Sequence, residues 1–343
     1  MLWPFLFLTT FASVAAKTAV PSTPSPSPSV SPGSVPNEQV LRAQIFLDAS
    51  AFKPGVIDGS WGEFTRKALL RYEKAHGRTP GNDGADPPSQ FDLPFDRSRP
   101  LLTPYQISPD DQQFIGPAPE SVAARAQLKQ LQYGSYLEFV AEKFHVRRDL
   151  LRALNPGYDW NQAKPGDSLT VPNIALPFSV EEAIKEKTKV EAAEKNDTLR
   201  TESDKPTQDQ FEIQISVTEK VLELYQAGKL VGSYPITPGS ESLPAPKGDW
   251  YVKGIVWMPT FRWDEAMLQH GERGSHAYHL PPGPNSPVGI VWMDLNHKGT
   301  GIHGTEAPET IGYTTSHGCV RLSNWDALDL GRKVLPGVHV KIR

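Results

Sequence analysis

The chain has 343 residues, a formal net charge of −4 at pH 7 and a sequence pI near 6.2. This balance, with no basic patch, argues against nucleic acid as a partner. A hydrophobic content of 38% suits globular modules, and the length allows two or three of them, whereas 33 prolines indicate that part of the chain is linker.

The first 36 residues have no pattern of a packed core. Residues 1–16 contain an apolar run at 2–8 and end in Val-Ala-Ala, which is the form of a secretory signal peptide, although a basic start is missing. The run is shorter than the roughly 20 residues of a membrane-spanning helix, so a membrane anchor is the weaker alternative. Residues 17–36, rich in Ser and Pro, are expected to be an extended linker. We therefore expect an exported protein of the periplasm or cell envelope, with no stable membrane span after signal cleavage.

Residues 37–77 have the apolar spacing of short helices, interrupted by the turn signals Pro54-Gly55 and Asp58-Gly59. The segment resembles the peptidoglycan-binding-1 type of domain, a small all-α bundle. The residues that match are mostly core and turn positions: Phe52, Pro54, Gly55, Ile57, Asp58, Gly59, Gly62, Thr65, Ala68, Leu69 and Tyr72. The resemblance implies peptidoglycan binding but no particular ligand contact. Residues 78–118, which begin rich in Pro, Gly and Asp, are expected to be a linker.

Residues 119–174 are expected to be a second module, with one helix over 119–133 and two more between 135 and 156. It resembles the LysM domain, a small α/β module that binds N-acetylglucosamine-containing glycans, at Leu154-Asn155-Pro156 and in the ending at 164–172. The usual opening is degenerate at 134–137, so the module is either a glycan binder or a spacer. Residues 175–209 alternate in charge sign and are expected to form a solvated spacer helix beginning after Ser179.

From residue 210 the apolar period changes to two, which predicts strands. Alternation at 211–215, a hairpin signal at 227–229 and strand-like runs at 250–252, 288–293 and 338–342 predict a mainly β domain over 210–343. One helix is expected over 325–334, capped by Ser323. This helix would follow directly after the only cysteine of the chain and support it.

Cys319 lies in a turn-prone Ser-His-Gly context rather than in an apolar run. A lone cysteine in an exported protein has no internal disulfide partner, so a reactive thiol is the better interpretation. A thiol with a pKa of about 8.5 needs a base at neutral pH. We expect His303 to be that base and His317, whose tether of two residues is short, to be a positioning residue. Gly318 would let the backbone N–H groups of Gly318 and Cys319 face a developing oxyanion.

This stretch resembles the signature of the YkuD-type L,D-transpeptidases, with His303-Gly304-Thr305, a spacer, and then 316–321 reading Ser-His-Gly-Cys-Val-Arg. The resemblance covers about 211–343. It implies that Cys319 attacks a peptidoglycan stem peptide, that His303 is the proton donor and acceptor, and that the Gly304 carbonyl orients the His303 ring. Ser316 is expected to form the turn. Arg321 either holds a substrate carboxylate or forms a structural ion pair.

Residues 258–284 are expected to be a flexible loop that walls the substrate groove. Trp263 and Tyr278 are its candidate substrate contacts, unless they fill the core. Metal binding by His276 and His279 is disfavoured, because no third ligand lies in register.

The resemblance implies an L,D-transpeptidase that acts on peptidoglycan stem peptides and glycan and needs no cofactor, and we expect a monomer. It would release D-Ala and transfer the acyl group to an amine. The alternatives are an L,D-carboxypeptidase with water as acceptor, a cross-link endopeptidase with the same residues, and a non-catalytic cell-wall binding protein.

Overall fold

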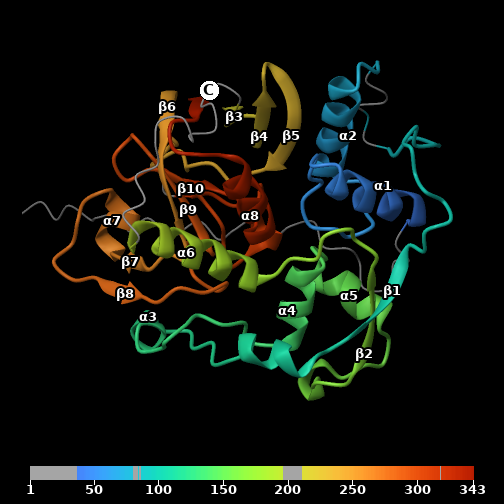
Figure 1. Cartoon of the computed structure of the whole chain (residues 1–343), viewed down its shortest axis with the longest axis horizontal. Coiled ribbons are helices and arrows are strands. Elements are labelled where there is room, and N and C mark those ends of the chain that lie inside the picture. Colours follow the sequence, from blue (N-terminus) through green and yellow to red (C-terminus); the bar gives the residue numbers. More distant parts are fainter. Residues whose placement is uncertain (1–36, 80–83, 85, 196–210, 317) are drawn as a thin grey trace, which may run out of the picture.

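The computed structural model describes residues 37–79, 84, 86–195, 211–316 and 318–343. The expected signal peptide, the linker at 17–36, the end of the spacer at 196–209 and the expected positioning residue His317 lie outside these residues. Figure 1 shows a β-rich C-terminal part at the upper left, a first N-terminal part at the upper right, and a second N-terminal part along the bottom, which reaches beneath the C-terminal part.

The C-terminal part is built on an eight-stranded mixed sheet with the strand order β11-β10-β9-β6-β12-β3-β4-β5. The prediction of a mainly β domain is confirmed. The strands are β3 (Phe211–Ser216), β4 (Val221–Gln226), β5 (Lys229–Pro235), β6 (Gly248–Trp257), β9 (Val291–Leu295), β10 (Gly301–His303), β11 (Val320–Arg321) and β12 (His339–Ile342).

The sheet is curled, because the chain that leaves one edge strand runs beside the other. Thr237, just after β5, pairs with Arg321 of β11 through a β-bridge. Helix α8 (Asn324–Lys333) packs against β9 and β10. It begins where the sequence predicts, because the Ser323 hydroxyl accepts a hydrogen bond from the Asp326 N–H at 3.2 Å.

The first module consists of α1 (Glu38–Ala49) and α2 (Glu63–Ala75) around a small apolar core. The buried Gln44 amide orders the loop between them: it donates to the Asp58 carboxylate at 2.9 Å and to the Thr65 hydroxyl at 3.0 Å. Its carbonyl accepts from the Gly59 N–H at 2.8 Å. The motif residues of this loop therefore maintain the fold.

Three parts of the expected linker at 78–118 are structured, and the third of them, at 109–114, is a short 3-10 helix. Phe91 and Leu93 are buried against the core of the first module. Strand β1 (Leu102–Gln106) pairs antiparallel with β2 (Ser168–Pro172). Sequence reasoning missed β1 because Pro104 lies in its middle, which is tolerated here in a sheet of only two strands.

Between β1 and β2 lie η1 (Pro109–Phe114), α3 (Val122–Arg125), α4 (Tyr136–Lys143), α5 (Arg148–Leu154) and η2 (Trp160–Gln162). The predicted helices at 135–156 are present. The helix expected over 119–133 is wrong in length, since α3 has only four residues. Ser135 is the N-cap of α4 and not part of an opening strand, because its side chain accepts from the Glu138 N–H. The opening strand of this module is β1.

The three parts meet at a buried polar junction. His145, of the second module, stacks on Trp325 of α8 with ring centroids 4.8 Å apart, and its Nδ1 lies 3.1 Å from the Asp48 carboxylate of α1. The 51–53 segment covers the edge of β5, since Phe52 pairs with Ser233. One apolar core runs continuously through residues of all three parts.

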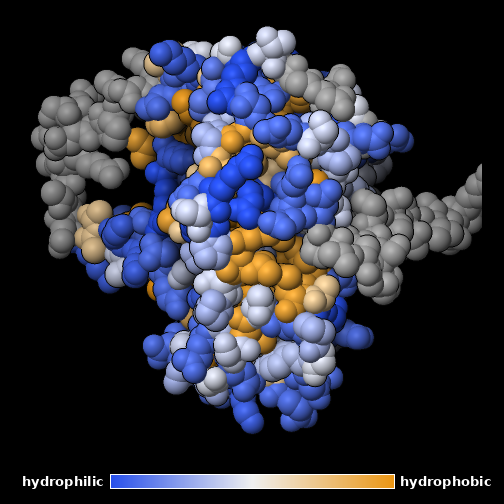
Figure 2. Space-filling view, turned by 90° about the vertical axis from the view of Figure 1, so that its right-hand side faces the viewer, coloured by the Kyte–Doolittle hydropathy of each residue, from blue (hydrophilic) through white to orange (hydrophobic). Residues whose placement is uncertain are grey.

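The expected spacer helix is present as α6 (Val180–Lys195), but its start is not solvated, since Val180 and Ala183 are buried and α6 contacts β6. Arg332 of α8 binds Glu182 of α6. Figure 2 views the N-terminal modules from the side, and hydrophilic residues dominate this face around one apolar area. Within the described ranges, every helix is too short or too polar to cross a membrane.

Candidate active site

The parallel pairing of β10 and β11 brings the segment that carries His303 next to the segment that carries Cys319. His303 pairs with Arg321, and the Leu322 N–H donates to the His303 carbonyl at 2.7 Å. Cys319 directly precedes β11, two residues before Arg321. All three side chains line one cavity of about 350 Å³.

The outer wall of this cavity comes from the segment that sequence analysis treats as a flexible loop. It contains β7 (Phe261–Trp263), α7 (Glu265–His270) and β8 (Tyr278–Leu280), and β7 pairs with β8. Trp263 lines the cavity. Tyr278, its partner across the strands, is 46% exposed and is not among the lining residues.

Asp264 gives this wall its order. Its buried carboxylate caps α7 through the Met267 N–H at 3.3 Å, binds the Gly274 N–H at 3.0 Å, and pairs with Arg262. Among the side chains that the structure describes, no group of three or more His, Cys, Asp or Glu is placed to hold a metal ion.

Cys319 follows a turn whose shape depends on Ser316 and Gly318. The buried Ser316 hydroxyl donates to the Cys319 carbonyl, so Ser316 has the position of a turn former. Gly318 has φ +91°, a conformation that a β-carbon would strain. The Cys319 Sγ lies 3.7 Å from the Gly299 carbonyl oxygen. Burial raises the pKa of the Cys319 thiol, and the Gly301 N–H and the Arg321 charge only partly oppose this.

His303 is buried, with 4% of its surface exposed, and its ring has two firm contacts. Its Nδ1 lies 2.7 Å from the Gly304 carbonyl oxygen, and its face stacks on Trp292 with ring centroids 5.2 Å apart. Burial, and then the charge of Arg321, lower the pKa of His303 to about 3. The ring is therefore neutral at pH 7, and the bond to Gly304 assigns the proton to Nδ1 and leaves Nε2 as the acceptor.

The resting pair is consequently a neutral thiol and a neutral imidazole. We expect the alkylation rate of Cys319 by iodoacetamide to rise with pH through a thiol pKa above the ordinary value of about 8.5. The opposite arrangement, a thiolate beside an imidazolium, would react at a constant rate across pH 5 to 8. A pH series of alkylation rates, followed by intact mass, distinguishes the two, and such a plateau would contradict the neutral pair.

Asn324, the first residue of α8, packs closely against Gly304. Its buried amide accepts from the Ile290 N–H at 3.2 Å and donates to the Pro284 carbonyl at 3.0 Å. A β-carbon on Gly304 would lie 2.2 Å from the Asn324 Oδ1, so glycine is needed there. Sequence reasoning assigned no role to Asn324, although an asparagine at the start of a helix just after the cysteine motif is a usable signal.

Trp292 is a second residue that sequence reasoning missed. It pairs directly with His303 across β9 and β10, and it lines the cavity. A β-carbon on Gly301 would lie 2.5 Å from the Trp292 ring, so this glycine makes room for the indole. An apolar strand in the sequence gives no indication that one of its residues stacks on the base.

Arg321 donates to the Thr315 carbonyl at 3.2 Å. No carboxylate among the described residues forms an ion pair with it within 4 Å. Glu306, the acidic residue that contributes to its electrostatic environment, is paired with Arg125 instead. The structural ion pair considered for Arg321 is therefore not formed within the described part of the chain.

Comparisons with known proteins agree on this region. The sequence profile of the YkuD family, an L,D-transpeptidase catalytic domain, matches residues 210–342. The putative L,D-transpeptidase YkuD of Bacillus licheniformis is 27% identical over 213 residues, which are 62% of this chain and 96% of that protein. The probable L,D-transpeptidase YbiS of Escherichia coli is 28% identical over 213 residues, 60% of this chain and 59% of that protein.

Among solved structures, a mutant L,D-transpeptidase of Enterococcus faecium is 22% identical. The alignment covers 41% of this chain and 52% of that chain, with a TM-score of 0.31. This chain thus spans about half the length of that structure but nearly all of the Bacillus licheniformis protein.

Proposed function

Because residues 210–342 form an L,D-transpeptidase catalytic domain of the YkuD family, we propose that this enzyme uses Cys319 to cross-link peptidoglycan stem peptides through a thioester. The observation that carries the proposal is that Cys319 lines the same cavity as a neutral His303 whose Nδ1 lies 2.7 Å from the Gly304 carbonyl oxygen. A neutral imidazole with a free Nε2 can accept the thiol proton, and the cavity holds room for a peptide.

In the first half-reaction, Sγ of Cys319 attacks the carbonyl between the L-centre of a diamino acid and the terminal D-Ala. The thiol proton passes to Nε2 of His303, and the backbone N–H groups of Gly318 and Cys319 stabilise the oxyanion. The C–N bond then breaks, the leaving nitrogen takes the proton, and D-Ala departs from a thioester.

In the second half-reaction, a neutral amine of another stem attacks the thioester. His303 takes a proton from that nitrogen and returns it to the departing sulfur, so the C–S bond breaks as the new amide forms. Arg321, which has no ion pair within the described residues, would bind a carboxylate of the donor stem. Trp263 and Trp292 offer apolar surface to the peptide.

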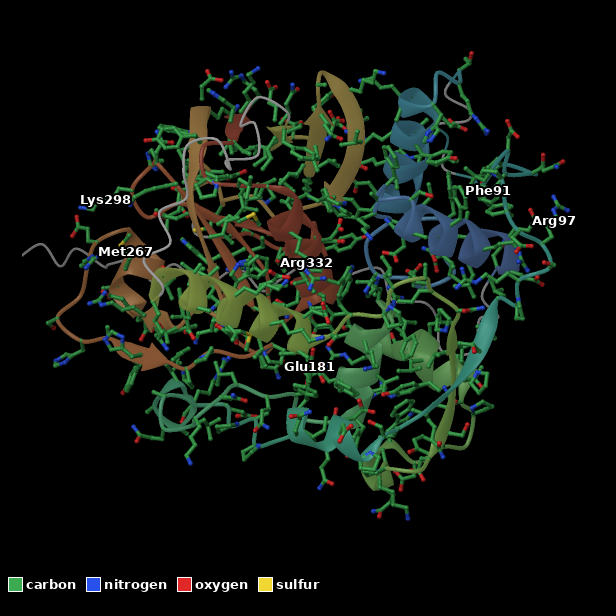
Figure 3. All side chains as sticks on the ribbon, in the orientation of Figure 1. Phe91, Arg97, Glu181, Met267, Lys298 and Arg332 are labelled. Atoms are coloured by element: carbon green, nitrogen blue, oxygen red, sulfur yellow. The ribbon has the colours of Figure 1, made fainter. Side chains whose placement is uncertain are left out.

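The N-terminal modules would keep the enzyme bound to peptidoglycan. We propose that the protein is exported, that the first module associates with peptidoglycan, and that the LysM-like module contributes a glycan contact. In Figure 3, Met267 of the cavity wall lies toward one end of the molecule, and Phe91 and Arg97, in the segment that follows the first module, lie toward the other end. This separation suits a module that holds the wall at a distance from the reacting stem.

The test is intact-protein mass spectrometry with purified muropeptides. A tetrapeptide stem without acceptor should add a tripeptide acyl mass to the enzyme and release D-Ala, and an acceptor amine should convert the adduct into cross-linked product. A pentapeptide stem, in which D-Ala follows D-Ala, is the matched control and should give no adduct. An adduct that resolves only to free tripeptide would indicate the carboxypeptidase, and no adduct would indicate a binding protein.

A further inference from the structure

Arg125 of the second module reaches into the wall of the catalytic cavity. Its guanidinium donates to the Asn285 carbonyl at 2.6 Å and to the Glu306 carboxylate, which lines the cavity. The Arg125 side chain is only 15% exposed. Its partners lie 160 and 181 residues away in the sequence, so the contact exists only in the folded enzyme.

The backbone around Arg125 is fixed to the same loop. The Leu131 N–H donates to the Pro282 carbonyl at 2.9 Å, and the Asn285 N–H donates to the Leu131 carbonyl at 3.0 Å. Gly283 approaches so closely that a β-carbon would lie 2.2 Å from the Leu131 carbonyl oxygen. The segment that carries Arg125 is therefore held against the catalytic domain by its backbone as well as by its charge.

Glu306 and Arg321 face the same cavity, yet their charges are not paired with each other. A carboxylate and a guanidinium in a partly desolvated pocket attract strongly and form charge-assisted hydrogen bonds. Arg125 already occupies the Glu306 carboxylate and binds it from outside the cavity. Arg321 lines the same cavity, and the Glu306 charge already acts on its guanidinium, so Arg321 is an alternative partner for Glu306 when Arg125 is absent.

We propose that Arg125 is a positioning residue that holds Glu306 away from Arg321, so that the Arg321 guanidinium stays available to a substrate carboxylate. The second module thereby keeps the positive charge of Arg321 available to the donor stem peptide. This inference rests on the proposed function only in naming the stem peptide as the carboxylate that Arg321 binds.

The test is a double-mutant cycle on Arg125 and Glu306. Arg125→Ala should raise KM for a tetrapeptide donor about tenfold with little change in kcat, because a lost charge-assisted contact in binding has about that effect. The double variant Arg125→Ala/Glu306→Ala should return KM to near the wild-type value, since the competing carboxylate is gone. Arg125→Lys keeps the charge, so its KM should fall between that of Arg125→Ala and that of the double variant.

A readout without peptide substrate separates this inference from the proposed function. Iodoacetate carries a carboxylate and iodoacetamide does not, so the ratio of their alkylation rates at Cys319 reports whether Arg321 is available. Arg125→Ala should lower this ratio toward that of Arg321→Ala, and the double variant should restore it. The matched control is Arg152→Ala, in α5 of the same module, whose side chain is 55% exposed and pairs with Asp149.

The two proposals fail in different ways. An unchanged alkylation ratio in Arg125→Ala, or a double variant as impaired as the single one, would overturn the role of Arg125 whatever the enzyme does with muropeptides. Melting temperatures of all variants exclude simple unfolding as the cause. A wild-type enzyme without turnover but with the expected pattern of ratios would leave the Arg125 inference standing and overturn the transpeptidase.

Discussion

Replacement of Cys319 by serine is expected to reduce acyl-enzyme formation by at least about a thousandfold, because a hydroxyl is a far weaker nucleophile than a thiol. An alcohol has a far higher pKa than a thiol, so proton transfer to His303, whose pKa burial lowers to about 3, is less favourable from serine than from cysteine. Serine is nearly isosteric, so the turn held by Ser316 should persist. Intact mass after incubation with a tetrapeptide stem measures the effect.

Cys319→Ala provides the control for binding. Its association with isolated peptidoglycan should equal that of the wild-type protein, because both modules are unchanged, while product formation disappears. A serine variant that kept a tenth of the wild-type turnover would show that the nucleophile lies elsewhere.

Replacement of His303 by asparagine is expected to lower turnover about 10²- to 10⁴-fold, the range for loss of a general base. Asparagine can still donate a hydrogen bond toward the Gly304 carbonyl, so it removes the base and preserves part of the local structure. The neutral state of His303 gives the loss a pH signature. It should be constant from about pH 5 to 8, and it should shrink at higher pH as the Cys319 thiol ionises without help.

His339→Asn is the matched control, since His339 lies exposed on β12 in the same domain. It should leave turnover and its pH profile unchanged. If His303→Asn retained normal turnover at pH 7, the proton would have to pass to another group, and His317 would become the first candidate to test by the same substitution.

The sequence could predict the meeting of Cys319 and His303 because their spacing and their glycines form a known pattern. It could not predict the residues that contact the His303 ring or that bind the charged groups of the cavity. Trp292 belongs to an ordinary apolar strand, and only the register of β9 against β10 places it on the His303 ring. Arg125 was outside any motif, and its contact with Glu306 depends on how two modules pack. Such contacts arise from tertiary structure and leave no local signal.

In the fold, too, the sequence predicts what depends on local patterns and misses what depends on tertiary contacts. Strand alternation and the Ser323 cap predicted the β domain and α8, since both are local patterns with strong signals. Strand β1 was missed because Pro104 weakens its signal and its partner β2 lies more than sixty residues away. The modules also looked separable in the sequence, whereas Arg148 of α5 binds Glu309 of η5 (Pro308–Thr310) at 2.8 Å across their boundary.

The junction of His145, Trp325 and Asp48 has a consequence for how the protein unfolds. The His145 ring of the second module stacks on Trp325 of α8, and its Nδ1 faces the Asp48 carboxylate of the first module, within a continuous apolar core. Removing the first module would expose the free edge of β5 and break the contact between His145 and the Asp48 carboxylate. Calorimetry should therefore record one cooperative transition. A catalytic fragment cut near residue 210 would be a poor surrogate for the enzyme, since its thermal tolerance depends on residues that perform no chemistry.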